Sequence, residues 1–301
     1  MSNPLLFIIV VLIWGSTWIG ISYQTGHLDP AVSVGLRFGI AASLLGLWCL
    51  IRGLSFKLPL HIHKQIVLVG LLFYTLDYTF LYAAQQHIIS ALLALLSSSI
   101  IYINVILRRM MLGKPMRLEV IIGATLGMIG VVMIFIPEFE AMSLNQGLKM
   151  GLLFAAASFL SAGVGNVVSE KILDQGTPVV QMNFYAMSYS LVFTFAFAFI
   201  SGAEIKLPQV ASYYYSLIYL AVFGSVIAFG AYMQLLRQIG SDKAAYVVLV
   251  YPLIALGFST VLEGYVWTWI SAVGVLIVLV GNAIAMGKLN AHLRIKTLPT
   301  I

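Results

Sequence analysis

Long apolar segments separated by short polar links run the whole length of the chain. Each segment has about 20 residues, the length at which an α-helix crosses the hydrocarbon core of a bilayer. The pattern therefore predicts an all-α integral membrane protein with ten transmembrane helices. The predicted spans are 4–23, 31–51, 66–84, 88–107, 118–136, 148–168, 182–202, 212–235, 244–264 and 266–287.

Glycine and proline positions recur along the chain at a nearly constant spacing. Gly15 and Gly163 lie 148 residues apart, as do Pro30 and Pro178. The agreement of these spacings with the order of the spans indicates an internal duplication. Further pairs lie 151 residues apart: Ser90 and Ser241, Gly113 and Gly264, Gly123 and Gly274, and Gly130 and Gly281.

The duplication predicts two units of five spans each. We assign the first unit to residues 1–140 and the second to residues 141–301, which includes a short basic cytoplasmic tail from Lys288. Because five is odd, the second unit enters the bilayer from the opposite side. The result is an inverted repeat, an architecture that recurs in carriers with alternating access.

Composition excludes a soluble protein, because hydrophobic residues make up 61% of the chain and charged residues only 9%. Soluble domains carry about 25% charged residues. The net charge of +6 does not indicate nucleic-acid binding, since the 16 Lys and Arg residues are spread between the spans. The single cysteine, Cys49, excludes an intrachain disulfide.

The distribution of Lys and Arg predicts the orientation in the membrane. With a cytoplasmic N-terminus, only Lys149 and Lys206 fall in outer links, and Arg37 falls within a span. This bias follows the positive-inside rule and predicts that both termini are cytoplasmic. The inner positions are Arg52, Lys57, Lys64, Arg108, Arg109, Lys114, Arg117, Lys171, Arg237, Lys243, Lys288, Arg294 and Lys296.

Two charged residues, Arg37 and Asp77, lie well inside predicted spans. Arg37 is about 9 Å and Asp77 about 10 Å from the outer ends of their helices, at 1.5 Å per residue. The similar depth allows a structural ion pair between them. In the alternative, both face a cavity, where Arg37 attracts a carboxylate and Asp77 an amine or a proton.

The third span carries a polar and aromatic stripe that favours a cavity. At 100° per residue, Tyr74, Asp77, Tyr78 and Tyr82 fall within an arc of about 140°. Tyrosine rings can stack on the apolar part of a ligand and hydrogen-bond its polar part. A buried contact between helices is the competing interpretation.

The first and ninth spans contain further candidates for a cavity wall. Trp14 lies about 15 Å deep, too deep for an interfacial belt, and Thr17 projects from the same face. In the ninth span, Pro252 follows Tyr251 and removes a backbone donor, which leaves carbonyl groups available to a ligand. Core packing and a plain helix kink are the alternatives. Gly123 and Gly127 indicate tight helix packing.

Sequence signatures of catalysis are absent. The chain has no G-x-S-x-G, H-E-x-x-H or Walker A motif, and His61 and His63 in a predicted cytoplasmic link have no acidic or cysteine neighbours. We therefore predict no catalytic residue, no metal site and no cofactor.

Several segments, in their order along the chain, resemble the drug/metabolite transporter superfamily and its EamA-type carriers. The resemblance covers nearly the whole chain. It implies a ten-helix inverted-repeat carrier of a bacterial inner membrane, whose cavity is built from the first four helices of each half. The segments are Trp14-Gly15-Ser16-Thr17-Trp18, Asp29-Pro30 with Arg37-Phe38, residues 81–86 with Ser90-Ala91-Leu92, and Leu262-Glu263-Gly264 with Gly274 and Gly281.

The chain departs from that pattern in its first half. Ile100-Ile101 stands where a proline is frequent, and Gly113-Lys114 stands where an acid is frequent, whereas Pro252 and Glu263 keep the pattern in the second half. We therefore expect the two halves to share a scaffold and to divide the chemistry.

We interpret the chain as a secondary transporter that exports small metabolites, such as amino acids or drug-like compounds, by alternating access. The expected partners are a small-molecule substrate and the lipid bilayer, without nucleic acid; a homodimer and a monomer are both left open. A passive facilitator or channel and an integral membrane enzyme are the alternatives. The expected substrate contacts are Trp14, Thr17, Arg37, Tyr74, Asp77, Tyr78, Tyr82, Tyr251 and Pro252, with Asp77 also as the candidate for proton coupling.

Overall fold

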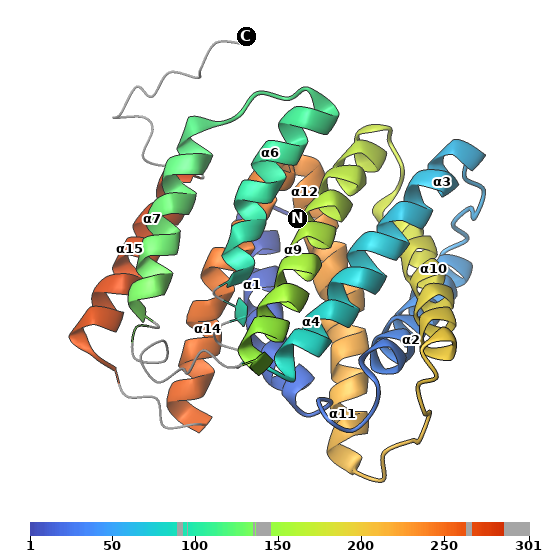
Figure 1. Ribbon diagram of the computed structural model, residues 1–301. Helices are drawn as coiled ribbons and strands as arrows, with labels where there is room; N and C mark the ends of the chain where they lie inside the picture. Colours follow the sequence, from blue (N-terminus) through green and yellow to red (C-terminus); the bar gives the residue numbers. More distant parts are fainter. Residues whose placement is uncertain (89–92, 95, 135, 137–145, 263–266, 286–301) are drawn as a thin grey trace.

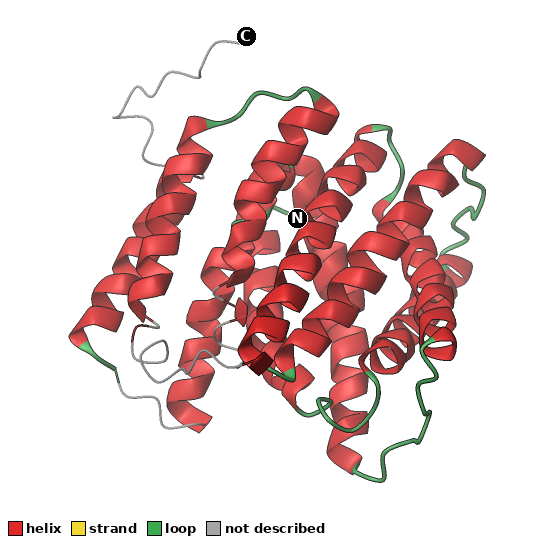
Figure 2. Ribbon diagram, in the orientation of Figure 1, coloured by secondary structure: helices red, strands yellow, loops and turns green. Residues whose placement is uncertain are grey.

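A computed structural model describes residues 1–88, 93–94, 96–134, 136, 146–262 and 267–285. These residues form helices and loops without a strand (Figures 1 and 2). The all-helical prediction is therefore confirmed for the described part of the chain. Ser90, Ala91, Leu92, Glu263, Gly264, the segment 137–145 of the predicted junction and the tail from Lys288 lie outside it.

The described part of the first half contains eight helical elements, two of which are not α-helical. The element η1 is a π-helix and η2 is a 3-10 helix. In order, the elements are α1 (Asn3–Ser22), α2 (Pro30–Ile51), α3 (Leu60–Val69), η1 (Gly70–Leu76), α4 (Asp77–Gln85), η2 (Ser97–Ser99), α6 (Ile100–Leu112) and α7 (Leu118–Ile134).

The second half follows the same sequence of long and short helices. A second π-helix, η3, interrupts the helix between α11 and α12. In order, the elements are α9 (Gln146–Asp174), α10 (Val179–Ile200), α11 (Ala211–Tyr219), η3 (Leu220–Ile227), α12 (Ala228–Ile239), α13 (Ser241–Ala244), α14 (Val247–Leu262) and α15 (Trp269–Ala285).

Among the described residues, six continuous helices are long and apolar enough to cross a bilayer by length and composition. The shorter apolar helices α7 and α15 have 17 residues each. Large apolar side chains such as Phe199, Ile200 and Trp269 are exposed on the outside of the bundle, as in a protein solvated by lipid. The six helices are Asn3–Ser22, Pro30–Ile51, Leu60–Gln85, Gln146–Asp174, Val179–Ile200 and Ala211–Ile239.

Several helix ends differ from the edges of the apolar runs. The third helix begins at Leu60, so His61 and His63 lie in α3 and not in a link as predicted. The sixth helix continues to Asp174, six residues beyond the predicted edge at 168. In both cases polar or charged residues with side-chain partners extend the helix beyond the apolar segment. His63 Nδ1 lies 2.9 Å from the Tyr189 hydroxyl, and Glu170 accepts from Arg108.

Local sequence signals explain how individual helices begin and end. The Asp29 side chain caps α2 by accepting a hydrogen bond of 2.8 Å from the Ala31 backbone N–H, and Pro30 occupies the first turn. Helix α6 ends at Leu112, and the φ of 63° at the following Gly113 lies in the left-handed region that glycine adopts without strain.

The two π-helices have matching internal hydrogen bonds. In η1, the Thr75 hydroxyl donates to the Gly70 carbonyl over 2.9 Å, and in η3 the Ser225 hydroxyl donates to the Leu220 carbonyl over 3.0 Å. Each hydroxyl thus bonds a carbonyl five residues earlier, which fits the wider turn of a π-helix. Such segments are frequent at functional sites.

Close glycine contacts join α7 to α15 at one side of the bundle (Figure 1). A Cβ atom built on Gly123 would lie 2.4 Å from the Gly281 carbonyl oxygen, and one on Gly130 would lie 2.5 Å from that of Gly274. The two helices therefore run antiparallel, because the lower number of one pairs with the higher number of the other. Absence of side chains lets the backbones approach this closely.

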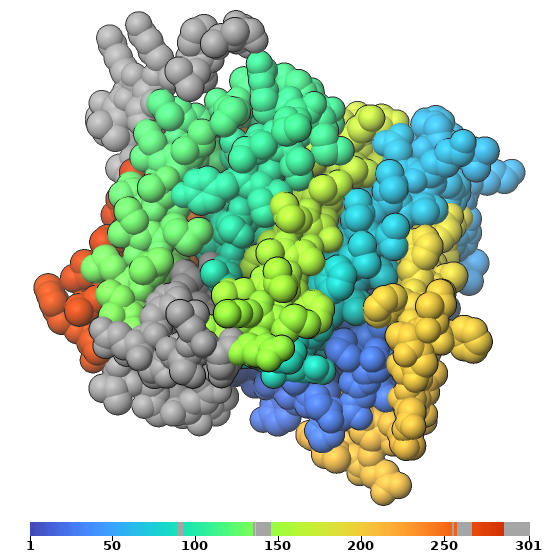
Figure 3. Space-filling model, viewed as in Figure 1, coloured from blue at the N-terminus to red at the C-terminus, as the bar shows by residue number. Residues whose placement is uncertain are grey.

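A second pair of glycine contacts shows the same relationship between the halves. A Cβ atom on Gly15 would lie 2.6 Å from Ile254 Cβ, and one on Gly163 would lie 2.2 Å from Ile103 Cγ2. Gly15 and Gly163 are 148 residues apart, and Ile103 and Ile254 are 151 apart. Helix α1 thus packs on α14 as α9 packs on α6. On the face drawn in Figure 3, side chains fill the space between α6 and α9.

Candidate functional site

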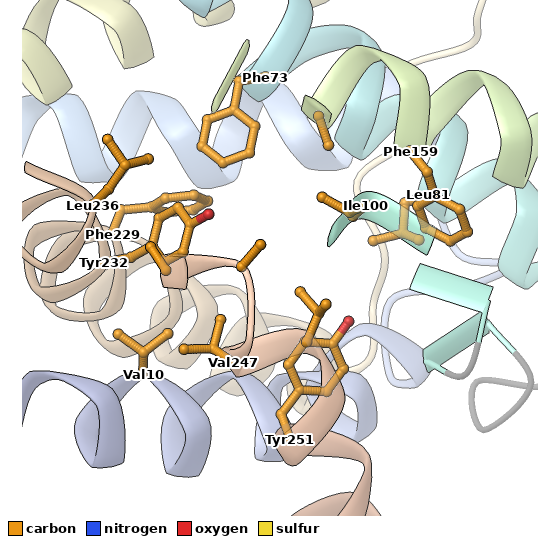
Figure 4. Close-up of a cluster of buried hydrophobic side chains, with 14 of the residues drawn as sticks. Val10, Phe73, Leu81, Ile100, Phe159, Phe229, Tyr232, Leu236, Val247 and Tyr251 are labelled. Atoms are coloured by element: carbon orange, nitrogen blue, oxygen red, sulfur yellow. The ribbon is translucent and has the colours of Figure 1, made fainter. Parts of the chain in front are cut away.

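A pocket of about 70 Å³ lies in the centre of the bundle. Its walls come from both halves of the chain, and Figure 4 shows Phe73, Ile100, Tyr232 and Tyr251 around the central space. Among the described residues, α7 and α15 supply none of its lining. The lining residues are Trp14, Thr17, Trp18, Ile21, Phe73, Asp77, Tyr78, Leu81, Ser97, Ile100, Phe159, Ala162, Asn166, Tyr232, Val248 and Tyr251.

Helix α1 supplies an aromatic wall. The Trp14 ring packs on Phe229 and Tyr232 at centroid distances of 5.2 and 4.9 Å, and its indole N–H donates to the Gly224 carbonyl over 3.3 Å. Thr17 lies on the same wall and donates to the Trp14 carbonyl within its own helix. Both side chains are therefore fixed in place beside the pocket.

Asp77 is the one charged residue among the described residues that line the pocket. It lies where η1 passes into α4, and its side chain is 7% exposed. The Ser158 hydroxyl on α9 donates to its Oδ1 over 2.6 Å. A buried carboxylate in a span is costly unless a partner or ligand compensates it, so its position in the pocket wall favours a functional role.

Arg37 lies behind the pocket wall and does not line it. Its Nε donates to the Ser225 hydroxyl over 2.9 Å, and its Nη1 donates to the Tyr82 hydroxyl over 3.5 Å. The guanidinium also stacks on the Tyr78 ring. Arg37 is 1% exposed, and no carboxylate within the described part of the chain lies at ion-pair distance from it. The direct Arg37–Asp77 pair that the sequence allows is therefore not formed.

The predicted stripe on the third helix is divided between two environments. Asp77 and Tyr78 line the pocket, whereas Tyr74 and Tyr82 lie outside its walls. The Tyr74 hydroxyl donates to Asn183 Oδ1 over 3.1 Å, and the Tyr82 hydroxyl donates to Gln24 Oε1 over 3.1 Å. These two tyrosines support the wall from behind.

In the ninth helix, Tyr251 lines the pocket and Pro252 does not. The Tyr251 hydroxyl is 2.5 Å from the Ser97 hydroxyl, which links α14 to η2 across the pocket. Pro252 is buried within α14. The Tyr251 carbonyl lies 3.0 Å from the Cβ position of Gly15, so α1 covers the backbone near the proline.

Sequence reasoning missed several residues of the pocket. Tyr232 donates to Asn166 Oδ1 over 2.9 Å, and both side chains line the wall between α12 and α9. The repeat spacing of 148 relates Trp18, which also lines the pocket, to Asn166. That correspondence could have directed attention to Asn166, whereas Tyr232 lies among apolar neighbours and gives no signal of its own.

A second cluster of charges, which the sequence did not reveal, lies at one end of the bundle. Arg108 on α6 is 5% exposed and donates from Nε to both carboxylate oxygens of Glu170 on α9, at 2.9 and 3.1 Å. Its Nη1 donates to Asp242 Oδ2 in α13 over 3.3 Å. From the sequence alone, Arg108 is an orientation signal only.

Lys114 extends this cluster into the link between α6 and α7. Its ammonium group lies 2.8 Å from Glu170 Oε1 and 2.6 Å from Asp174 Oδ2. Partial burial lowers the pKa of Lys114, but its hydrogen bonds to Asp174 and Glu170 outweigh this and leave the pKa above its ordinary value. Lys114 therefore stays positively charged beside the two acids.

The fold and the central pocket define a multi-pass helical membrane protein that can enclose a small solute. The sequence model of the EamA-like transporter family matches residues 1–136 and 149–287. The chain therefore belongs to the EamA-like transporter family, as its resemblance to EamA-type carriers predicted.

Full-length relatives support the assignment at low identity. The uncharacterized transporter YoaV of Bacillus subtilis is 24% identical over 249 residues, covering 83% of this chain and 84% of YoaV. The uncharacterized inner membrane transporter YedA of Escherichia coli is 26% identical over 255 residues, covering 84% of this chain and 80% of YedA. A Salmonella typhimurium protein named "Probable amino-acid metabolite efflux pump" is 24% identical over 289 residues, covering 93% of each chain.

A solved crystal structure has the same fold. It matches with a TM-score of 0.78 at 18% sequence identity, covering 96% of this chain and 98% of the other. The chain is thus a membrane transporter by family, with a bilayer and a small-molecule substrate as its partners.

Proposed function

We propose that the protein is a secondary transporter that exports small metabolites, such as amino acids or drug-like compounds, by alternating access around the central pocket. The observation that carries the proposal is the Asp77 carboxylate in the wall of a pocket built from both halves of the chain. A carrier needs a binding site near the middle of the membrane, between units that can rock against each other.

The proposed scaffold is an inverted repeat of five and five helices, with units at residues 1–140 and 141–301. The antiparallel pairing of α7 with α15 supports it, since the pairs Gly123–Gly281 and Gly130–Gly274 exchange under a shift of 151 residues. The two π-helices, Gly70–Leu76 and Leu220–Ile227, begin 150 residues apart and also support it.

The proposed location is a bacterial inner membrane with both termini cytoplasmic. The bias of Lys and Arg toward one side of the predicted topology supports this orientation. The α6–α7 link, which holds Lys114 and Arg117, lies at the upper end of Figure 1. The α9–α10 link, which follows Lys171, lies at the same end. The α10–α11 link with Lys206 lies at the lower end.

The pocket chemistry favours a substrate with a protonated amine and an apolar or aromatic body. Asp77 can neutralise an ammonium group, and the rings of Trp14, Trp18 and Tyr251 can attract a cation or cover an apolar side chain. The name of the Salmonella typhimurium relative includes amino-acid metabolites, which carry such an amine. The small volume fits a metabolite better than a bulky compound.

A thermal-shift screen of the purified protein tests the substrate class. Ligands that bind the folded state raise its melting temperature, so amines and amino acids should stabilise the protein more than matched carboxylates that lack the amine. Asp77→Asn should abolish that difference, and Ser212→Ala, a change outside the pocket, should leave it intact. Equal stabilisation by amines and carboxylates in the unchanged protein contradicts the assignment.

Asp77 is also the proposed site of proton coupling, because it is the one carboxylate among the described pocket-lining residues. Reconstituted protein should move a screened substrate when a pH gradient is imposed across the liposome membrane. Asp77→Asn should remove the response to the pH gradient, so that any exchange that remains is the same with and without the gradient. Gradient-driven uptake that survives Asp77→Asn excludes this role.

A further inference from the structure

We propose that the charged cluster of Arg108, Lys114, Arg117, Glu170, Asp174 and Asp242 is an ionic gate that closes the central pocket at one end of the bundle. The proposal rests on the proposed carrier function, because it assigns a closing device to the same pocket. Its support is independent, since it comes from a cluster that contributes no described lining residue to that pocket.

The cluster joins three separate helices through buried contacts. Glu170 on α9 is 1% exposed, and its carboxylate accepts from Arg108 on α6. The same carboxylate accepts from the backbone N–H and the hydroxyl of Ser241, at the start of α13, over 3.0 and 2.6 Å. The Glu170 carboxylate on α9 therefore bonds residues of both α6 and α13 and holds the three helices together.

Asp242 in α13 binds two of the arginines of the cluster. It pairs with Arg108 and also with Arg117, whose Nη1 lies 3.5 Å from Asp242 Oδ1. Arg117 also donates to the Ile239 carbonyl over 3.1 Å. The cluster then holds three cations and three acids, so its net charge is zero. A balanced, hydrogen-bonded set is the form in which charges tolerate burial, and loss of one partner leaves the others uncompensated.

The backbone at Gly240 is fitted to this cluster. Its φ is 89°, in the region that favours glycine, and a Cβ atom there would lie 2.8 Å from Arg108 Nη2. One turn from Arg108 on α6, the Asn104 side chain donates to the Ser241 carbonyl over 3.0 Å. Helix α13 is thus tied to α6 at two successive turns.

The cluster stands between the pocket and a second hollow at the same end. This outer hollow has a volume of about 330 Å³ and includes Arg108, Glu170 and Leu236 in its lining. Asn166 and Tyr232 line the pocket, and Glu170 and Leu236 follow them by four residues on α9 and α12. Four residues rise about 6 Å along a helix, so one layer of side chains separates the two spaces.

The sequence positions that the repeat spacings relate to this cluster carry no equivalent charges. The repeat spacings relate Glu170 to Ser22, Arg108 to Ser259 and Asp242 to Ala91. Ionic closure at this end would bias the carrier toward the state that is closed there. Breaking the cluster should therefore shift the population toward the state in which the outer hollow and the pocket are continuous.

Cysteine accessibility tests the gate without a substrate. The single cysteine, Cys49, is replaced by alanine, and Thr17→Cys then places a reporter in the pocket. A membrane-impermeant maleimide is added to right-side-out and to inverted membrane vesicles. Gln238→Cys, in the exposed lining of the outer hollow, identifies the preparation in which the reagent reaches the cluster end.

Glu170→Gln and Arg108→Gln should each raise the rate of Thr17→Cys labelling from the cluster end by about tenfold. Lys114→Gln keeps the Arg108–Glu170 pair and should give a smaller increase; its partly exposed side chain makes it the variant most tolerant of folding. Lys206→Gln, which removes an exposed pair with Glu204 in the α10–α11 link, is the matched control and should change nothing.

Unchanged labelling in folded Glu170→Gln and Lys114→Gln protein, with folding verified by size-exclusion chromatography and melting temperature, overturns the gate. Increased labelling in protein that shows no saturable substrate exchange retains the gate and rejects the carrier mechanism. Saturable exchange with unchanged labelling retains the carrier and rejects the gate. The two proposals can therefore fail separately.

Discussion

The guanidinium of Arg37 lies over the ring of Tyr78, with its Cζ atom 4.7 Å from the ring centroid. Tyr78 lines the pocket and Arg37 does not, so the aromatic ring separates the buried cation from the space for substrate. Hydrogen bonds to Ser225 and Tyr82 hold the guanidinium in that position. The surface that a ligand meets is therefore aromatic and acidic, although a positive charge lies close behind it.

The Tyr78 ring should matter more than its hydroxyl group. Tyr78→Phe keeps a ring under the guanidinium, so its melting temperature should stay close to that of the unchanged protein. Tyr78→Leu removes an interaction that contributes about 0.5–2 kcal/mol and should lower the melting temperature clearly. Thermal unfolding in detergent measures both. An equal loss in the two variants would mean that the hydroxyl, and not the stacking, is important.

The hydroxyls of the two π-helices should differ in their effect on stability. Ser225→Ala leaves a charged Arg37 donor without its partner, which should cost about 1–3 kcal/mol of unfolding free energy. Thr75→Val at the matching position removes a bond to the neutral Ser190 hydroxyl and should cost less. Ser225→Thr retains the hydroxyl as a control. A larger loss for Thr75→Val than for Ser225→Ala contradicts this ranking, which thermal unfolding can measure.

The contact between α7 and α15 should not tolerate a methyl group. Gly130→Ala places a Cβ atom 2.5 Å from the Gly274 carbonyl oxygen, and overpacking of this kind costs roughly 1–3 kcal/mol. Gly230→Ala is the matched control in α12, because no atom lies within 4 Å of its Cβ position. Melting temperatures should fall for Gly130→Ala and hold for Gly230→Ala. Equal values would show that the two helices separate readily.

The sequence was sufficient to predict the helical class and to single out Asp77, which the structure places in the pocket wall; its role in transport stays a prediction. Apolar length is a direct consequence of bilayer thickness, and a carboxylate within a span is rare enough to identify a site. The tight packing predicted at Gly123 and Gly127 is confirmed within the chain, where Gly123 meets Gly281 and Gly127 meets Leu249.

A regular helical projection could not predict which side chains of the third helix face the pocket. A rotation of 100° per residue places Tyr74 and Tyr82 beside Asp77, but Gly70–Leu76 is a π-helix with a wider turn. The wider turn changes the direction in which Tyr74 projects relative to Asp77. This contributes to the position of Tyr74 behind the pocket wall. No local pattern in the sequence indicates this change.

The Arg108 cluster could not be recognised from the sequence for a different reason. Arg108 and Glu170 are near the ends of apolar segments, where most charges face water and set orientation. Their pairing joins residues 62 positions apart on different helices. Only the tertiary arrangement distinguishes this buried pair from ordinary charges at the membrane edge.

Counterflow in proteoliposomes tests the central claim, that the protein is a carrier acting around the Asp77 pocket. Liposomes are loaded with an unlabelled amine or amino acid that stabilises the protein in the thermal-shift screen, and a trace of labelled compound is added outside. A carrier should accumulate the label transiently above equilibrium, with saturable kinetics, and Trp14→Ala should weaken this exchange. Uptake that rises in proportion to concentration without transient accumulation would contradict the account and identify a passive facilitator or channel.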